Sequence, residues 1–316
     1  MRIRESQWQK VSSRLESHTS SSSPVPATLM AYLAANLRNV SRQPGTLLRL
    51  HRTFATMAPG LATKYEINAD MGEGFGRWKM GPDEELMPFL DAANIACGFH
   101  AGDPSIMLKT IRLCKQHGVK AGAHPGLQDL FGFGRRKMDV DPQDLYAMVL
   151  YQVGALKAML DAEGVELSHI KPHGELYFYM QRDKTIMKTV LEACAVFSVP
   201  VYACQNPQQQ AMCDEMGVPF QGEVYVDVNY SPEGTIVPVK PGQKITPEMC
   251  YARASSAAMH DTGKDVDGRE FKYGFDGKPF SVCLHSDLPS VLENAKIVRR
   301  AVDEANKAKF HSGAHL

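Results

Sequence analysis

Residues 94–118, NIACGFHAGDPSIMLKTIRLCKQHG, contain a strand, a loop and a helix in that order. The apolar run at 94–100 predicts the strand, and the helical spacing of apolar residues at 104–117 predicts the helix. Proline is favoured in the first turn of a helix and glycine directly after the last turn, so Pro104 and Gly118 indicate where this helix begins and ends. A strand followed by a helix in this way is the repeating unit of a parallel sheet covered by helices.

The same unit recurs along the rest of the chain. Strands are predicted at residues 65–70, 94–100, 119–124, 169–173, 199–204, 218–225 and 280–285. Helices are predicted at residues 83–92, 104–117, 142–163, 183–197, 207–216, 247–262 and 289–308. The segments at 226–246 and 263–279 are rich in glycine and proline, so we expect loops or small hairpins there. Seven strands that alternate with helices predict a single parallel (β/α) barrel of the TIM type, closed or incomplete, and the alternative is an open doubly wound sheet.

Residues 1–62 differ in composition from the remainder. They are rich in serine, threonine and arginine, and residues 1–60 hold eight Lys or Arg against two acidic residues. This composition is typical of an organelle transit peptide; a disordered extension and a segment upstream of a true start at Met57 are the alternatives. We therefore expect one folded domain at residues 63–310 and a cytoplasmic or mitochondrial location.

Composition and charge exclude several classes of protein. Apolar residues make up 44% of the chain and charged residues 22%, as in ordinary soluble globular proteins. No apolar run is long enough to span a membrane, and a net charge of zero gives no electrostatic reason to expect binding to nucleic acid. The seven cysteines are scattered and odd in number, without a C-x-x-C pair, which argues against a disulfide framework.

Chemically active side chains follow the predicted strands at the point where each strand ends. In a parallel barrel these ends meet on one face, which is where active sites lie. The residues are Asn68, Asp70 and Glu73 after the first strand, His100 and Asp103 after the second, His124 after the third, Lys171 and His173 after the fourth, and His285 and Asp287 after the last. Any one of them could be structural, and Asp103, directly before Pro104, could cap the helix that follows. Together they predict a functional site at the barrel mouth.

These side chains favour acid–base hydrolysis of an amide-like bond, with or without a metal ion. Imidazoles bind Zn²⁺ and similar ions, which makes His100, His124 and His173 candidate metal ligands. Arg135 and Arg136, in the motif FGFGRRKM, could bind a substrate carboxylate or could be solvated loop residues. The chain has no phosphate loop, and its G-x-G-x-G stretch after the first strand lacks the spacing of a dinucleotide site, so we expect no familiar nucleotide site.

Several stretches, in this order, resemble the LamB/YcsF family. They are INADMGEGFG, ANIACGFHAGDP, GVKAGAHPG, FGFGRRKM, LYQVGALKAML, HIKPHGELY and VCLHSD, and they cover the chain from about residue 65 to about residue 300. The resemblance implies a seven-stranded barrel related to the glycoside hydrolase and polysaccharide deacetylase superfamily. It also implies the opening of 5-oxoproline, a lactam, to glutamate at the expense of ATP, together with other 5-oxoprolinase subunits that carry further steps.

The resemblance places the catalytic residues at the matching positions Asp70, Glu73, His100, Asp103, Lys171 and His173. Asp70 or His173 would act as the general base that activates water. His100 or Lys171 would protonate the leaving nitrogen or stabilise the oxyanion. For substrate binding we expect Asn68, Arg135, Arg136, Asp227 and His285. ATP would be used through the partner proteins, because this chain has no phosphate loop of its own.

The sequence departs from the family pattern at two positions. Val228 and Val239 stand where bacterial members have arginine. If those arginines hold the substrate carboxylate or a partner protein, the substrate or the partnership differs here. Lys240 could compensate only loosely, because lysine lacks the planar fork of a guanidinium.

Two other functions stay open on this reasoning. The chain could be a metal-dependent amidase that resembles carbohydrate deacetylases, in which case its activity would need a bound metal ion but no ATP. It could also be a non-catalytic subunit that presents the substrate to partner proteins. In that case the isolated chain would bind 5-oxoproline without turning it over.

Overall fold

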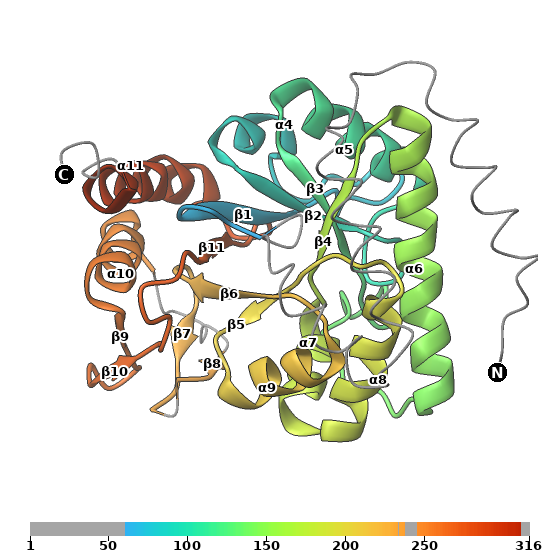
Figure 1. Ribbon diagram of the computed structural model, residues 1–316. Coiled ribbons are helices and arrows are strands. Elements are labelled where there is room, and N and C mark those ends of the chain that lie inside the picture. The colour runs from blue at the N-terminus through green and yellow to red at the C-terminus, as the bar shows by residue number, and fades with distance from the viewer. Residues whose placement is uncertain (1–60, 233, 238–244, 311–316) are drawn as a thin grey trace, which may run out of the picture. The chain divides into compact units, whose positions relative to one another are not determined.

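The structure, a computed structural model, describes residues 61–310 apart from 233 and 238–244 (Figure 1). Almost all of the predicted extension at 1–62 lies outside the described residues, so its nature stays a prediction, as do the boundaries of a single domain at 63–310. Val239 also lies outside them. None of the described helices is long and apolar enough to cross a membrane.

Seven parallel strands of the described chain close into a barrel, as the sequence predicts. They are β1 (Glu66–Met71), β2 (Ala92–Ala96), β3 (Lys120–His124), β4 (Leu167–Ile170), β5 (Val201–Cys204), β6 (Phe220–Tyr225) and β11 (Ser281–Leu284). Going round the barrel, β1 to β6 follow one another, and β11 joins β6 to β1 with Ser281 opposite Glu66. This closure excludes the open doubly wound sheet. The carboxyl ends of all these strands therefore meet at one mouth.

Helices surround the barrel (Figure 1). They are α4 (Asp83–Leu86) with the 3₁₀ turn η1 (Met87–Phe89), α5 (Pro104–His117), α6 (Pro142–Glu163), α7 (Gly174–Arg182), α8 (Lys184–Ala195), α9 (Pro207–Met216), α10 (Pro247–His260) and α11 (Val291–Phe310). The helix predicted at 83–92 is shorter than expected, because η1 ends at Phe89 and β2 already begins at Ala92. Helix α7 has no counterpart in the prediction, since no side chain caps its start at Gly174.

Capping chemistry explains why other helix boundaries were predictable. In α5, α6 and α9, an Asp or Asn side chain accepts backbone N–H groups of the first turn, a proline follows it, and a left-handed glycine comes after the last turn. These caps are Asp103 and Gly118 for α5, Asp141 and Gly164 for α6, and Asn206 and Gly217 for α9. Only glycine adopts this left-handed conformation without steric cost, so it marks the end of a helix reliably.

Two small antiparallel hairpins lie in the segments that are rich in glycine and proline. Strand β7 (Asn229–Tyr230) pairs with β8 (Ile236–Val237), and β9 (Thr262–Lys264) pairs with β10 (Glu270–Lys272). The first hairpin comes directly after β6, so it emerges at the carboxyl end of a barrel strand. It therefore borders the mouth.

Alternation along the strands separates an apolar outer layer from a polar interior. In β1, Ile67, Ala69 and Met71 belong to the hydrophobic core. Asn68 and Asp70, on the other face of the same strand, bond to polar side chains of other strands across the barrel interior. The interior below the mouth is therefore built for polar groups.

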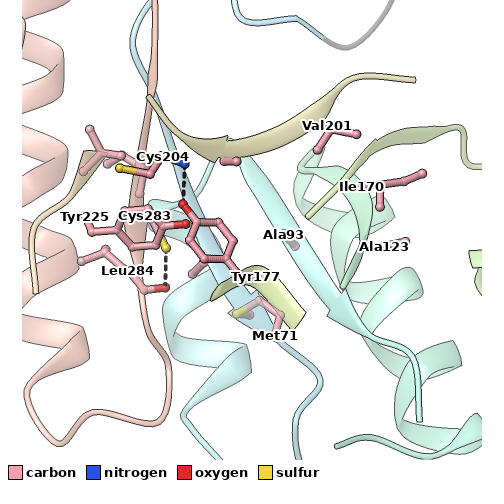
Figure 2. Close-up of a cluster of buried hydrophobic side chains, with 14 of the residues drawn as sticks. Met71, Ala93, Ala123, Ile170, Tyr177, Val201, Cys204, Tyr225, Cys283 and Leu284 are labelled. Carbon is pink, nitrogen blue, oxygen red and sulfur yellow. Dashed lines mark hydrogen bonds between the residues drawn. The ribbon is translucent and has the colours of Figure 1, made fainter. Parts of the chain in front are cut away.

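Figure 2 shows a part of the core that anchors α7. The Tyr177 hydroxyl of α7 accepts a hydrogen bond from the backbone N–H of Cys204 in β5. Its ring centroid lies 6.0 Å from that of Tyr225 in β6. Because α7 begins immediately after His173, this anchoring also fixes where His173 lies.

Gly122 of β3 tests how tightly the barrel interior is packed. A Cβ atom at Gly122 would lie 2.2 Å from His169 Cε1, which is closer than packed atoms approach. We expect Gly122→Ala to lower the free energy of unfolding by roughly 1–3 kcal/mol, the range for overpacked cores. Urea unfolding measures this change.

The control is Gly154→Ala within α6, where an added Cβ would meet no atom within 4 Å. This substitution should raise the free energy of unfolding by about 0.5–1 kcal/mol, because alanine favours a helix interior. A Gly122→Ala variant as stable as the wild type would contradict the packing described here.

Candidate functional site

Six of the predicted strand-end residues line a cavity of about 340 Å³ at the barrel mouth: Asp70, His124, Lys171, His173, His285 and Asp287. Asn68, Glu73, His100 and Asp103 are not among its lining residues. Its polar lining residues are Asp70, His124, Arg135, Lys171, His173, Glu175, His285 and Asp287. The rest of the lining is mainly apolar or aromatic and comes from the end of β6, from α7 and β8, and from the loops that follow β4, β6 and β11. Side chains that are distant in the sequence thus converge on one space, as expected at the carboxyl ends of parallel strands.

An ion pair between Asp70 and Lys171 borders the cavity. Lys171 Nζ lies 3.2 Å from Asp70 Oδ1 and 3.5 Å from Glu223 Oε1, and all three side chains are buried. Burial alone would lower the pKa of Lys171, but the charges of Asp70 and Glu223 raise it well above its usual value. Burial likewise opposes ionisation of Asp70, yet His124 and Lys171 hold the pKa of this carboxyl well below its usual range. Both groups are therefore charged at neutral pH.

Backbone carbonyls fix the protonation of two histidines in the site. His124 Nδ1 lies 2.7 Å from the carbonyl oxygen of Lys171, and His173 Nε2 lies 2.8 Å from that of Phe133. A carbonyl only accepts hydrogen bonds, so these two nitrogens carry the protons. His124 Nε2 then faces His173 Nδ1 at 2.9 Å and Asp70 Oδ1 at 3.3 Å. Two lone pairs would repel across 2.9 Å, and either a proton on His124 Nε2, shared with His173, or a metal ion between the two nitrogens would remove that repulsion.

Glu73 and His100 complete a buried cluster with His124 and His173. Glu73 Oε1 lies 3.4 Å from His100 Nε2 and 3.7 Å from His173 Nδ1. Among the described residues, neither Glu73 Oε1 nor either ring nitrogen of His100 makes a hydrogen bond, although buried polar atoms without one are costly. One ligand atom from each of the four residues lies within 4.8 Å of the others. The cluster could therefore hold a metal ion.

Burial determines the charges of this cluster. It raises the pKa of Glu73 well above its usual value, and the nearby Asp70 and Asp287 carboxylates shift it in the same direction. It lowers the pKa of His100 well below its usual value, and the neighbouring His173 acts in the same direction. Burial therefore favours the uncharged form of both groups, whereas a cation among them would favour the ionised carboxylate.

Two glycines allow the chain to pack closely over the cluster. The rings of His100 and His173 stack with their centroids 3.7 Å apart. A Cβ atom at Gly134 would lie 2.7 Å from His100 Cβ and 2.9 Å from His173 Cδ2, and one at Gly126 would lie 2.6 Å from His100 Nδ1. The glycines of the motifs GAHPG and FGFG therefore belong to the site, because no larger residue fits there.

His285 differs from the histidines of the cluster because it is partly exposed to the cavity. Its side chain is 16% exposed, against at most 3% for the other three. Asp227 Oδ1 lies 2.8 Å from His285 Nδ1, and Asp227 Oδ2 accepts the backbone N–H of His285 at 2.7 Å. Burial alone would lower the pKa of His285, but Asp227 raises it above its usual value. The second ring nitrogen, Nε2, lies 4.0 Å from Asp70 Oδ2.

A comparison with known protein families supports what these motifs indicated. A family model described as the LamB/YcsF family matches residues 65–314. The chain belongs to the LamB/YcsF family. The match covers the whole barrel, so the resemblance inferred from the strand-end motifs is confirmed.

Named relatives of this LamB/YcsF chain are matched over nearly their full length. It is 43% identical over 251 residues to the lactam utilization protein lamB of Emericella nidulans, covering 79% of this chain and 98% of the relative. It is 40% identical over 245 residues to a protein of Pyrococcus abyssi that is named as a subunit of 5-oxoprolinase, covering 76% and 94%. The crystal structure of a lactam utilization protein from Thermus thermophilus superposes with a TM-score of 0.70 at 38% identity, covering 77% and 98%.

Asp103, predicted from the family motif to be catalytic, does not line the cavity. Its carboxylate accepts the backbone N–H groups of Ser105 and Ile106 in the first turn of α5, and that of Gly76 at 2.8 Å. These backbone hydrogen bonds lower the pKa of Asp103, that from Gly76 most. The alternative considered from the sequence, that Asp103 caps the helix that follows, therefore explains why this residue lies directly before Pro104.

The two arginines predicted to bind substrate lie in different environments. Arg136 pairs with Asp129, and its side chain is 61% exposed and outside the cavity lining. Arg135 lines the cavity, where it pairs with Asp287 at 2.9 Å. Of the two, only Arg135 is placed to contact a ligand.

Residues that the sequence did not single out hold the ion pair in place. Asn94 donates a hydrogen bond to Asp70 Oδ1 at 2.8 Å, and its own amide oxygen lies 2.7 Å from His169 Nε2. Glu223 accepts from the amide of Asn68, which is fully buried and supports the site from below the cavity. Asn94 is the one polar residue of β2, which is a signal that could have found it, whereas Glu223 shares β6 with Gln221 and does not stand out in the same way.

The cap role of Asp103 leads to a stability prediction. Asp103→Ala should lower the free energy of unfolding by about 0.5–2 kcal/mol, because the first turn of α5 loses its side-chain acceptor. Asp103→Asn keeps an acceptor oxygen and should retain most of that stability. Thermal unfolding of the two variants checks this, and an alanine variant as stable as the wild type would show that the cap is unimportant.

Proposed function

We propose that this LamB/YcsF chain hydrolyses the amide bond of a lactam, 5-oxoproline or a related ring, at the barrel mouth. Membership of the family, and relatives named as a lactam utilization protein and as a subunit of 5-oxoprolinase, support the proposal. The observation that carries it is the cavity where the Asp70 carboxylate lies between the Lys171 ammonium and the His285 imidazole. Amide hydrolysis needs a base, a positive charge and an acid in such an arrangement.

Each of these groups has a role in opening the ring. Water adds to the carbonyl carbon, the C–N bond of the ring breaks, and the ring nitrogen takes up a proton. Asp70 would accept the proton of the attacking water, and Lys171 would stabilise the negative charge on the carbonyl oxygen. His285, whose pKa Asp227 raises, would donate the proton to the leaving nitrogen.

Two roles considered from the sequence fit this geometry less well. His173 is a poor general base, because a backbone carbonyl and a neighbouring histidine engage both of its ring nitrogens. His100 is a poor proton donor, because it is fully buried and burial lowers its pKa well below the usual value. The proposal therefore assigns the base to Asp70 and the acid to His285.

Substitution of the proposed base and acid tests these roles. Asp70→Asn and His285→Asn should each lower kcat by at least about 100-fold, the usual contribution of general acid–base catalysis. The measurement is steady-state hydrolysis of 5-oxoproline and of 2-pyrrolidinone, with and without ATP, by the complex purified from its native cell.

Matched substitutions at exposed positions, Asp161→Asn and His117→Asn, should keep the wild-type kcat. Circular dichroism would confirm that all four variants are folded. A near-normal kcat in folded Asp70→Asn or His285→Asn would show that the roles are assigned wrongly.

We also propose that ATP is used through partner proteins. The sequence has no phosphate loop, and one of the relatives is named as a subunit. ATP-dependent turnover by the complex but not by the isolated chain would support this. Turnover by the isolated chain that needs a metal ion but no ATP would favour a deacetylase-like amidase, and binding without turnover would favour a substrate-binding subunit.

We further propose that the cluster of Glu73, His100, His124 and His173 holds one divalent metal ion. The facing lone pairs of His124 and His173, and the unpartnered atoms of Glu73 and His100, support this. Three imidazoles and one carboxylate suit Zn²⁺ or another first-row transition ion better than Mg²⁺ or Ca²⁺, which prefer oxygen ligands. Such an ion would supply Lewis-acid polarisation of the amide carbonyl.

The metal proposal can be tested without an activity assay. After treatment with a chelator, the protein should bind one Zn²⁺ per chain by calorimetry, and binding should raise the unfolding temperature. Glu73→Gln should weaken the affinity by at least about 10-fold, whereas His117→Gln, at an exposed position, should not. If Zn²⁺, Co²⁺, Ni²⁺ and Mn²⁺ all fail to bind, a shared proton joins His124 to His173 in place of a metal ion.

A further inference from the structure

The cavity at the mouth contains two unlike sets of lining side chains. One set carries the proposed catalytic groups Asp70, Lys171 and His285. The other set is apolar or aromatic and consists of Pro172, Tyr177, Phe178, Tyr225, Val228, Ile236, Val237 and Leu288. A ring that binds with its amide at the catalytic groups therefore places its remaining atoms among these apolar side chains.

Val228 is held at the cavity by contacts of its backbone. Its carbonyl oxygen, together with that of Val226, accepts hydrogen bonds from the guanidinium of Arg253. The same guanidinium bonds to Asn229 Oδ1 at 3.1 Å. Val228 lines the cavity, whereas Arg253 does not. The guanidinium of Arg253 therefore holds this loop beside the ligand space without contributing its charge to the lining.

The cations that do line the cavity already have carboxylate partners. Lys171 lies between Asp70 and Glu223, and Arg135 pairs with Asp287 at 2.9 Å. A substrate carboxylate would therefore lose its hydration beside existing negative charges. Among the described lining residues, no unpaired lysine or arginine is available to form an ion pair with it. Burial of an unpaired charge is strongly unfavourable.

The volume of the cavity also bears on the size of the substrate. About 340 Å³ lies at the lower end of the roughly 300–1,000 Å³ that small-molecule sites occupy. That space accommodates a five-membered lactam together with a substituent on its ring. The apolar lining determines what kind of substituent is favoured.

We infer that the substrate is an uncharged lactam with an apolar group on the ring, and that Val228 helps to select it against lactams that carry a carboxylate. This inference rests on the proposed lactam hydrolysis and specifies which lactam the site favours. An alkyl group gains from contact with Val228, Ile236 and Val237, whereas a carboxylate at the same place would lie beside these apolar side chains, and the lysine and arginine of the lining already have carboxylate partners.

Three substrates that share one ring provide the test: 5-oxoproline, 2-pyrrolidinone and 5-methyl-2-pyrrolidinone. The complex purified from its native cell should show the highest kcat/KM for the methyl compound, at least about 10-fold above that for 5-oxoproline. Val228→Arg should raise kcat/KM for 5-oxoproline and lower it for the methyl compound, which reverses the ranking, because the added guanidinium would pair with the carboxylate.

Two controls separate this effect from general ones. Val266→Arg adds the same charge at an exposed valine outside the cavity lining and should leave the ranking unchanged. Lys240→Ala should also leave it unchanged, since the inference assigns no role to Lys240, which lies outside the described residues.

The outcomes distinguish the inference from the proposed function. If the wild type prefers 5-oxoproline, the inference is overturned while lactam hydrolysis stands. If none of the three lactams is hydrolysed with or without ATP, the proposed function fails as well. The wild-type ranking decides the matter even if Val228→Arg does not fold.

Discussion

The buried ion pair between Asp70 and Lys171 is the interaction on which the rest of the mouth depends. Two charges removed from water in this way persist only when both are paired and hydrogen-bonded. Asn94 and Glu223 satisfy that need from other strands of the barrel. The pair lies in a polar interior, whereas the apolar residues of β1 that belong to the core, Ile67, Ala69 and Met71, lie on the other face of the strand.

Charge at the mouth is balanced in small local groups. Lys171 is paired with carboxylates at the end of the barrel interior, Arg135 is paired with Asp287, and His285 is paired with Asp227. Little net charge is left over to attract a charged ligand. Recognition at such a mouth depends on neutral hydrogen bonds and on shape, while the fixed charges are available to act on the bond that reacts.

Much of the fold could be predicted because its signals are local: Pro104 and Gly118 mark the ends of α5 by backbone chemistry alone. Helix α7 could not, because it depends on the packing of Tyr177 against distant strands.

The strand-end residues of the site were predictable from barrel geometry. The role of Asp103 was ambiguous, because one residue type serves both as cap and as catalyst. The contact between His124 and His173 depends on how each imidazole ring is oriented, and no sequence pattern predicts that orientation.

The rings of His100 and His173 stack on each other, and Gly134 packs closely against both. Neither ring therefore has room to rotate. The cluster is therefore ordered before any ligand arrives, so binding there involves little loss of side-chain entropy. The same crowding of unpartnered buried atoms opposes folding. Selection of this protein in the laboratory for heat resistance alone would therefore replace these residues early, and a thermostable variant obtained that way would keep the barrel and lose its chemistry.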